Sequence, residues 1–182
     1  MTTSVEPAVK IGRGTAAEGD SGRKADVLVV FGITGDLAKV MTFRSLYRLD
    51  ERGLLDCPIV GVAVDDWSVD QLRERAHDSI ESTGPIDEKV FERFANRLSY
   101  VEGDFAESST YGRVAEAIQH AESPVFYLEI PPFLFGTVVK GLAEAGLTKN
   151  ARIVVEKPFG HDGASAVELA DELHQYIDES QL

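Results

Sequence analysis

The sequence predicts an α/β protein with a doubly wound parallel sheet and helices on both faces. Short apolar runs rich in Val and Ile alternate with longer amphipathic stretches, as in a series of βαβ units. The apolar runs are continuous, which is typical of strands that are covered on both faces. A pair of glycines follows the first run directly, as in a tight turn from a strand into a helix. Together these observations favour a Rossmann-like architecture.

The expected strands and helices alternate along the chain. Apolar runs predict strands at 27–31, 59–64, 98–101, 125–130 and 153–155. Helices are expected at 37–52, 68–81, 85–97, 111–120, 133–145 and 164–178. Ser68 and Gln71 have the spacing of a capping box, and Gly146 is suited to end a helix. The apolar positions expected to share a face are Leu37, Val40, Met41, Leu46 and Leu49 in the first helix, and Val167, Leu169, Leu173 and Ile177 in the last.

Length and composition limit the function classes. The 182 residues correspond to one domain, with 1–25 expected as a disordered tail and 26–182 as a dinucleotide-binding domain. The 18 Lys and Arg against 31 Asp and Glu give a net charge of −13, which disfavours nucleic-acid binding and anionic membrane surfaces. No segment has the apolar length needed to cross a bilayer. The single cysteine, Cys57, excludes an internal disulfide and fits a cytoplasmic location.

The segment after the first strand has the features of a phosphate-binding turn. Gly32 and Gly35 allow the backbone to turn tightly and to approach a pyrophosphate, and the helix that follows offers free N–H groups. The hydroxyl group of Thr34 could donate to a phosphate oxygen or cap the turn, and both alternatives stay open. The carboxylate of Asp36 would repel a phosphate, so we expect it to cap the helix that begins near Leu37.

Other nucleotide-binding motifs and metal sites find little support. A P-loop needs a Gly-Lys pair, and the sequence contains none. Short-chain dehydrogenases share a glycine turn of this kind but use a Tyr-x-x-x-Lys pair, and none of the five tyrosines has Lys four residues later. The spacing of histidines and carboxylates suggests no metal site.

Three motifs, each after an expected strand, resemble those of glucose-6-phosphate dehydrogenases. They are Gly-x-x-Gly-Asp-Leu-Ala-Lys at 32–39, Phe-Tyr-Leu-Glu-Ile-Pro-Pro at 126–132 and Glu-Lys-Pro-Phe-Gly at 156–160. The resemblance extends over about 27–182 and implies NADP or NAD as cofactor. It implies that Lys157 contacts both cofactor and substrate, glucose 6-phosphate, and that family members oligomerise. The implied cofactor-binding residues are Gly32, Thr34, Gly35, Asp36, Leu37, Gly103, Asp104, Pro131 and Lys157, and a cis bond at the Pro131-Pro132 pair is an open alternative.

The sequence departs from the family pattern at three places. Val64 stands where the family has an arginine for the 2′-phosphate of NADP, and Asp65 could instead accept from a ribose 2′-hydroxyl. Val40 and Met41 replace positions that tend to be basic, so we expect weakened NADP preference and tolerance of NAD. Glu129 lies in an apolar strand where a small residue is common. If it is buried, it needs a partner or a raised pKa; the alternative is that it touches water at a sheet edge.

The resemblance also implies residues that this chain does not contain. The family's general base is a histidine in an Asp-His-Tyr-x-Gly-Lys segment, and the chain ends at Leu182 before it. His77, His120, His161 and His174 match no part of that segment, so we expect no catalytic residue here. Two hypotheses follow: an amino-terminal coenzyme domain of a glucose-6-phosphate dehydrogenase, inactive alone, or a stand-alone, non-catalytic NAD(P)-binding module.

The resemblance implies a carboxyl-terminal substrate domain that this chain lacks as well. Without that domain we expect the apolar residues Leu173 and Ile177 to be exposed. From this exposure we predict marginal stability and self-association.

Overall fold

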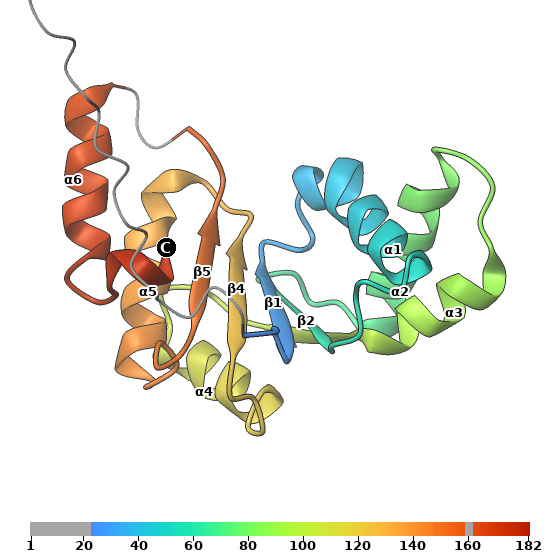
Figure 1. Ribbon diagram of the computed structural model, residues 1–182, viewed down its shortest axis with the longest axis horizontal. Coiled ribbons are helices and arrows are strands. Elements are labelled where there is room, and N and C mark those ends of the chain that lie inside the picture. The colour runs from blue at the N-terminus through green and yellow to red at the C-terminus, as the bar shows by residue number, and fades with distance from the viewer. Residues whose placement is uncertain (1–22, 159–161) are drawn as a thin grey trace, which may run out of the picture.

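A five-stranded parallel sheet forms the centre of the computed structural model, which describes residues 23–158 and 162–182 (Figure 1). The tail expected at 1–25 lies outside the described residues as far as residue 22. The strand order is β3-β2-β1-β4-β5, and neighbouring strands are parallel, so the expected fold class is confirmed. The strands are β1 Val27–Phe31, β2 Ile59–Ala63, β3 Leu98–Glu102, β4 Pro124–Leu128 and β5 Arg152–Val155.

The strand order places a switch point between β1 and β4. From β1 the chain passes outward through β2 to β3, and it then returns to the other side of β1 as β4. Val30 of β1 pairs with Gly61 of β2 on one side and with Tyr127 of β4 on the other. In open α/β sheets, the connections diverge at such a point and leave a crevice at the carboxyl ends of the strands.

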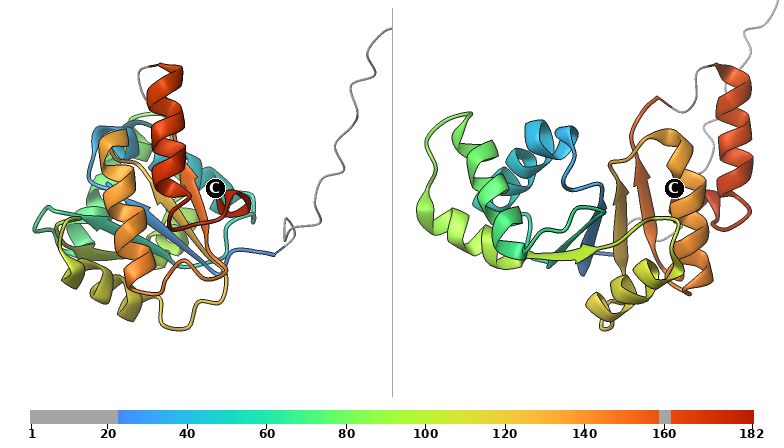
Figure 2. Two further views of the ribbon diagram at one scale, coloured as in Figure 1. Left: turned by 90° about the vertical axis from the view of Figure 1, so that its left-hand side faces the viewer. Right: turned by 180° about the vertical axis from the view of Figure 1, so that it is seen from behind.

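Helices cover both faces of the sheet (Figure 2). One face carries α1 Phe43–Glu51, α2 Val69–Glu81 and α3 Glu88–Arg97, and the π-helical turn η1 Ala38–Thr42 leads into α1. The other face carries α4 Ser108–Ala117, α5 Phe135–Glu144 and α6 Gly163–Leu173, with the short 3₁₀ turns η2 Pro132–Leu134 and η3 Glu179–Gln181. In the part of the chain that the structure describes, every helix is too short or too polar to span a membrane.

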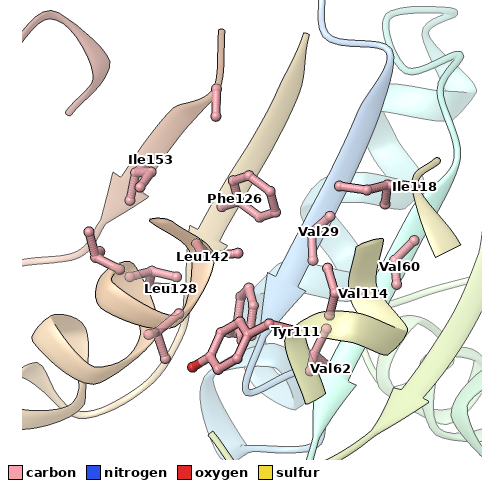
Figure 3. Close-up of a cluster of buried hydrophobic side chains, with 14 of the residues drawn as sticks. Val29, Val60, Val62, Tyr111, Val114, Ile118, Phe126, Leu128, Leu142 and Ile153 are labelled. Atoms are coloured by element: carbon pink, nitrogen blue, oxygen red, sulfur yellow. The ribbon is translucent and has the colours of Figure 1, made fainter. Parts of the chain in front are cut away.

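Each face of the sheet has its own apolar core. Figure 3 shows the core under α4 and α5, in which Tyr111 and Val114 of α4 lie near Val62 of β2, and Phe126 of β4 lies near Leu142 of α5. Phe126 is completely buried, as are many of its neighbours. In the inner strands β1 and β2, neighbouring residues enter different cores, so these strands are apolar throughout, as the continuous runs predicted. The edge strands β3 and β5 also carry polar residues, such as Ser99, Glu102 and Arg152.

Two expected helix ends are confirmed. The side chain of Ser68 accepts from the backbone N–H of Gln71 at 3.2 Å, and the side chain of Gln71 accepts from the N–H of Ser68 at 2.8 Å. These two bonds form the predicted capping box at the start of α2. Gly146 has a φ of 72°, the left-handed conformation that ends α5.

The prediction of which residues form the apolar face of the first helix is wrong. Leu37, Val40, Met41 and Leu49 are exposed, and of the expected set only Leu46 is buried. The reason is η1, because a π-helical turn contains an extra residue and rotates the positions on either side of it. The buried residues are Ala38, Thr42, Phe43, Leu46, Tyr47 and Asp50.

The prediction that the carboxyl-terminal apolar residues are exposed is also wrong. Leu173 is 1% exposed and Ile177 is 5% exposed, and both belong to the core under α5. The helix ends at Leu173 instead of 178, and the backbone N–H of Ile177 donates to the carbonyl of Leu173 at 3.1 Å. This turn folds Ile177 back onto the core, so the residues offered as a reason for self-association are covered within the chain.

Candidate functional site

The turn after β1 is tightly packed at the switch point. Gly32 has a φ of 86°, and a Cβ atom added to it would lie 2.2 Å from the carbonyl oxygen of Glu129. The N–H of Gly32 donates to the carbonyl of Val62 at 2.8 Å, and the N–H of Gly35 donates to the carbonyl of Gly32 at 2.9 Å. The turn is therefore held between β2 and the end of β4 in a conformation that requires glycine.

The helix that follows presents its first turn to the solvent. Asp36 and Leu37 are exposed, and the first N–H groups of any helix have no partner within it. The carboxylate of Asp36 makes no capping hydrogen bond among the described residues, so the cap expected from it is absent. The helix start thus remains available to an anion.

The residues expected to select the cofactor lie on the surface at the end of β2. The side chain of Val64 is 59% exposed. The hydroxyl group of Thr34 donates to the carboxylate of Asp65 at 2.5 Å, a partner that neither of the two alternatives for Thr34 included. The backbone carbonyl of Asp65 accepts from the hydroxyl group of Tyr100 at 2.6 Å and from the N–H of Trp67 at 2.9 Å. These bonds join the glycine turn to the loop after β2.

Gly103 and Asp104 form the neighbouring turn after β3. The N–H of Gly103 donates to the carbonyl of Ala63 at 2.8 Å, and a Cβ atom on Gly103 would lie 2.3 Å from the Thr110 hydroxyl oxygen. Asp104 accepts from the N–H of Ala106 through its side chain at 2.8 Å and from Thr110 through its carbonyl at 2.6 Å. These contacts give both residues a local role at the start of α4.

Glu129 is a buried acid at the centre of the site. It is 9% exposed, and its N–H donates to the carbonyl of Phe31 at 2.9 Å, which extends the β1–β4 pairing. Its carboxyl oxygen Oε1 accepts from the hydroxyl group of Thr42, and Oε2 is buried without a partner. Burial raises the pKa of Glu129 to about 7, and the charge of Glu156 adds to the rise. The hydrogen bond from Thr42 and the nearby hydroxyl group of Tyr127 favour the ionised form and oppose the rise. Of the two alternatives left open by the sequence, the buried one is correct.

A cavity of about 350 Å³ opens beside Glu129 at the ends of β4 and β5. The Tyr127 hydroxyl group donates to Oε1 of Glu156 at 2.7 Å across it. Burial and the hydrogen bond to Glu156 raise the pKa of Tyr127, so its hydroxyl group stays protonated as a donor. The cavity is lined by Leu37, Met41, Thr42, Ser45, Leu46, Tyr127, Glu156 and Lys157.

Lys157 and Pro131 lie at the carboxyl ends of two neighbouring strands. Both residues are exposed, Pro131 just before η2 and Lys157 at the mouth of the cavity. Within the described ranges, the cis peptide bond joins Lys157 to Pro158, and the Pro131-Pro132 bond is trans. The rest of the third motif, Phe159 and Gly160, and His161 lie outside the described residues.

The site residues therefore form two groups. Gly32, Gly35, Leu37, Pro131 and Lys157 surround the ends of β1, β4 and β5, whereas Val64, Asp65, Gly103 and Asp104 follow β2 and β3. Sequence reasoning missed Thr42, Tyr127 and Glu156. A polar residue near the end of each of two neighbouring strands could have indicated the contact between Tyr127 and Glu156.

Two features away from the crevice were not expected. A larger cavity of about 560 Å³ lies between α4 and α5, beside Tyr111 and Gly141. His77, Asp78 and Glu81 of α2 place possible metal-ligand atoms within 4.8 Å of one another. Asp78 and Glu81 are exposed, and exposed acidic groups commonly lie together without a metal.

A parallel sheet with a glycine turn at its switch point defines the chain as a dinucleotide-binding domain of the dehydrogenase type. Residues 29–182 match the family model described as "Glucose-6-phosphate dehydrogenase, NAD binding domain". The chain therefore belongs to this family.

Relatives and solved structures agree with this assignment. The chain is 54% identical over 161 residues to glucose-6-phosphate 1-dehydrogenase 1 of Mycobacterium tuberculosis, which covers 88% of the chain and 34% of the relative. The Bacillus subtilis glucose-6-phosphate 1-dehydrogenase is 33% identical over 168 residues, which covers 86% of this chain and 34% of the relative.

Two solved structures show the same fold. Glucose-6-phosphate 1-dehydrogenase from Mycobacterium avium superposes with a TM-score of 0.84 at 51% identity, covering 87% of this chain and 35% of that one. A glucose-6-phosphate dehydrogenase in complex with its substrate glucose-6-phosphate superposes with a TM-score of 0.77 at 31% identity. The match covers 86% of this chain and 35% of that one. The chain thus spans about a third of the length of these relatives.

Proposed function

We propose that this chain is the coenzyme-binding part of an enzyme that oxidises glucose 6-phosphate to 6-phosphogluconolactone with NAD(P)⁺. The observation that carries the proposal is the Gly32–Gly35 turn, which packs on the carbonyl of Glu129 at the β1–β4 switch point. The carbonyl oxygen of Glu129 fills the space that a Cβ atom at Gly32 would need, so the tight turn requires glycine there. The turn leads directly into a helix, which is the arrangement that a pyrophosphate site requires. Membership of the family supports the class of cofactor.

In this proposal each part of the crevice has a separate task. The N–H groups of the turn and of the helix start at Asp36 and Leu37 hold the pyrophosphate, and NAD(P)⁺ when bound supplies the hydride acceptor. Lys157 presents its ammonium group to the cofactor and to the phosphate of glucose 6-phosphate, and Pro131 shapes the neighbouring wall. The helix start fits an anion because no described side chain caps it.

We also propose that residues 1–182 bind cofactor without turnover. His77 lies beside Phe91 and Glu88 of α3, and His174 ends α6, so neither is part of the crevice. Oxidation of the C1 hydroxyl group requires a base that takes its proton as the hydride leaves. The two thirds of the relatives that lie outside the match would supply that base and the rest of the substrate site.

The surface after β2 supports tolerance of NAD. Val64 offers no charge to a 2′-phosphate, and the absence of a charge-assisted hydrogen bond costs about 1.5–3 kcal/mol of binding free energy. Asp65 is fixed by Thr34 with its carboxylate on the surface, where it can accept from a ribose 2′-hydroxyl group.

Calorimetric titration of the chain with NAD⁺ and with NADP⁺ tests the proposal. We expect both cofactors to bind, with dissociation constants within about tenfold of each other. Gly35→Ala, whose Cβ would lie 3.2 Å from the carbonyl oxygen of Gly32, should weaken both. Gly112→Ala, which meets nothing within 4 Å, is the control. NADP⁺ binding a hundredfold tighter would contradict NAD tolerance, and binding of neither would overturn the proposed function.

A further inference from the structure

Glu129 contacts three elements at the nucleotide-binding turn. Its N–H extends the pairing with β1, its carbonyl oxygen lies against the Cα of Gly32, and its carboxyl group accepts from Thr42 of η1. Thr42 is itself 6% exposed, so the hydrogen bond between the two side chains is shielded from water. One residue therefore joins the strand, the turn and the first helix.

The carboxyl group of Glu129 lies in surroundings that suit its neutral form. Oε2 is buried with no partner, and a buried charge without full hydrogen bonding is costly. The titratable groups that act on it are Tyr127 of β4 itself and Glu156 after β5, and the latter opposes ionisation. From η1 it is faced by Thr42, which does not titrate, and Lys157 lines the adjacent cavity.

We propose that Glu129 is a positioning residue that couples a proton to the conformation of the nucleotide-binding turn. The neutral carboxyl group is compatible with the buried position and with the contact between its backbone and Gly32. An ionised carboxylate must gain hydrogen bonds or move toward the cavity, and either change acts on Gly32 through the shared contact. The predicted effect on cofactor affinity rests on the proposed function. The predicted effect on the conformation of the turn does not depend on it.

The sign of the effect on binding follows from charge. The pyrophosphate of NAD(P)⁺ is anionic and would lie on the same turn, so ionised Glu129 would repel it. Cofactor affinity should therefore fall as the pH rises from 6 to 8.5, by about tenfold for a typical coupling between sites. Glu129→Gln keeps the shape of the side chain and removes the charge. The cofactor affinity of this variant should therefore stay, from pH 6 to 8.5, near the value that the wild type has at pH 6.

Amide NMR of the full chain without cofactor, from pH 5.5 to 8.5, tests the coupling directly. We expect the amides of Gly32 and Gly35 to titrate with the same midpoint as the Glu129 carboxyl carbon, and this titration to vanish in Glu129→Gln. Gly112 should not follow it. A turn that does not titrate, or that titrates equally in Glu129→Gln, would overturn the proposal.

Titration with NAD⁺ at pH 6 and 8.5 supplies the second readout. A fall in affinity for the wild type and no fall for Glu129→Gln supports the coupling, whereas equal falls in both contradict it. Glu168→Gln, an exposed acid on α6, controls for removal of a negative charge. If NAD⁺ binds at neither pH, the proposed function fails, and the amide titration still decides the role of Glu129.

Discussion

The two halves of the proposed cofactor site are built differently. At the β1–β4 junction, the turn at Gly32 is enclosed by backbone, with the buried Glu129 beneath it. At the end of β2, Val64 and Asp65 project from the surface, and Asp65 is fixed by bonds to Thr34 and Tyr100. Under the proposed function, the first region would bind the pyrophosphate that all dinucleotides share, and the second would face the ribose where they differ. Changes at the junction should thus affect both cofactors, and changes after β2 should affect their ratio.

The largest effect is expected at the junction itself. In Gly32→Ala the added Cβ would lie 2.2 Å from the carbonyl oxygen of Glu129 at a φ of 86°. Overpacking costs roughly 1–3 kcal/mol, and the left-handed conformation adds about 1–2 kcal/mol. We expect binding of NAD⁺ and NADP⁺ to be lost together in calorimetry. Gly53→Ala, with a φ of 68° and open space around it, should lose stability and keep binding. Selective loss of one cofactor in Gly32→Ala would contradict the comparison.

A pH-dependent stability difference should follow from Glu129. Its pKa is raised from 4.5 to about 7 on folding, so the folded state holds the proton more tightly than the unfolded state. The contribution of Glu129 to stability should therefore fall as the pH rises from 4.5 to 7, by up to about 3 kcal/mol at 1.36 kcal/mol per pKa unit.

Glu129→Gln removes the source of this loss. Urea unfolding at pH 5 and pH 8 should show the variant gaining stability relative to the wild type at the higher pH. Glu168→Gln on the exposed face of α6 should show no such gain. A parallel pH dependence for Glu129→Gln and the wild type would argue against a buried, neutral carboxyl group.

An arginine at the end of β2 should change the cofactor ratio. Val64→Arg places a guanidinium group where it can bind a 2′-phosphate, a charge-assisted bond worth about 1.5–3 kcal/mol. Affinity for NADP⁺ should rise about tenfold to a hundredfold, with that for NAD⁺ little changed. Val167→Arg is a matched control, since Val167 is 60% exposed and Val64 is 59% exposed. An equal gain for both cofactors would show that the added charge acts nonspecifically.

The smallest effect is expected from Thr34→Val. The change removes the hydrogen bond that orients the Asp65 carboxylate, which is worth about 0.5–1.5 kcal/mol. NAD⁺ affinity should fall by a few-fold, and the free energy of unfolding should change by less than about 1 kcal/mol because the bond is exposed. Thr137→Val, exposed on α5, is the control for loss of a hydroxyl group. Unchanged NAD⁺ affinity in Thr34→Val would contradict the proposal that Thr34 orients Asp65 for binding of the ribose.

The sequence predicted the features of the fold that depend on local pattern. Continuous apolar runs located all five strands of the described chain to within two residues at either end, because burial on both faces leaves few polar positions in the inner strands. The capping box of Ser68 and the helix end at Gly146 were predicted because each depends on a few neighbouring residues. The turn at Gly32 and Gly35 was found for the same reason.

Features that depend on distant contacts were not predictable. The π-helical turn changed which residues of the first helix are buried, and it places Thr42 opposite Glu129, 87 residues later in the chain. Ile177 is buried because the chain turns after Leu173, and a helical repeat alone would have left it on the helix surface. The hydrogen bond between Thr34 and Asp65 required the fold to bring two loops together.

Chemical-shift mapping of the chain with NAD⁺ tests most directly whether the cofactor binds at the switch point. We expect saturable shifts at the amides of Gly32, Gly35 and Ile130, and no change at Gly112 and Gly141, which lie beside the larger α4–α5 cavity. Saturable shifts at Gly112 and Gly141 with no change at Gly32 and Gly35 would contradict it.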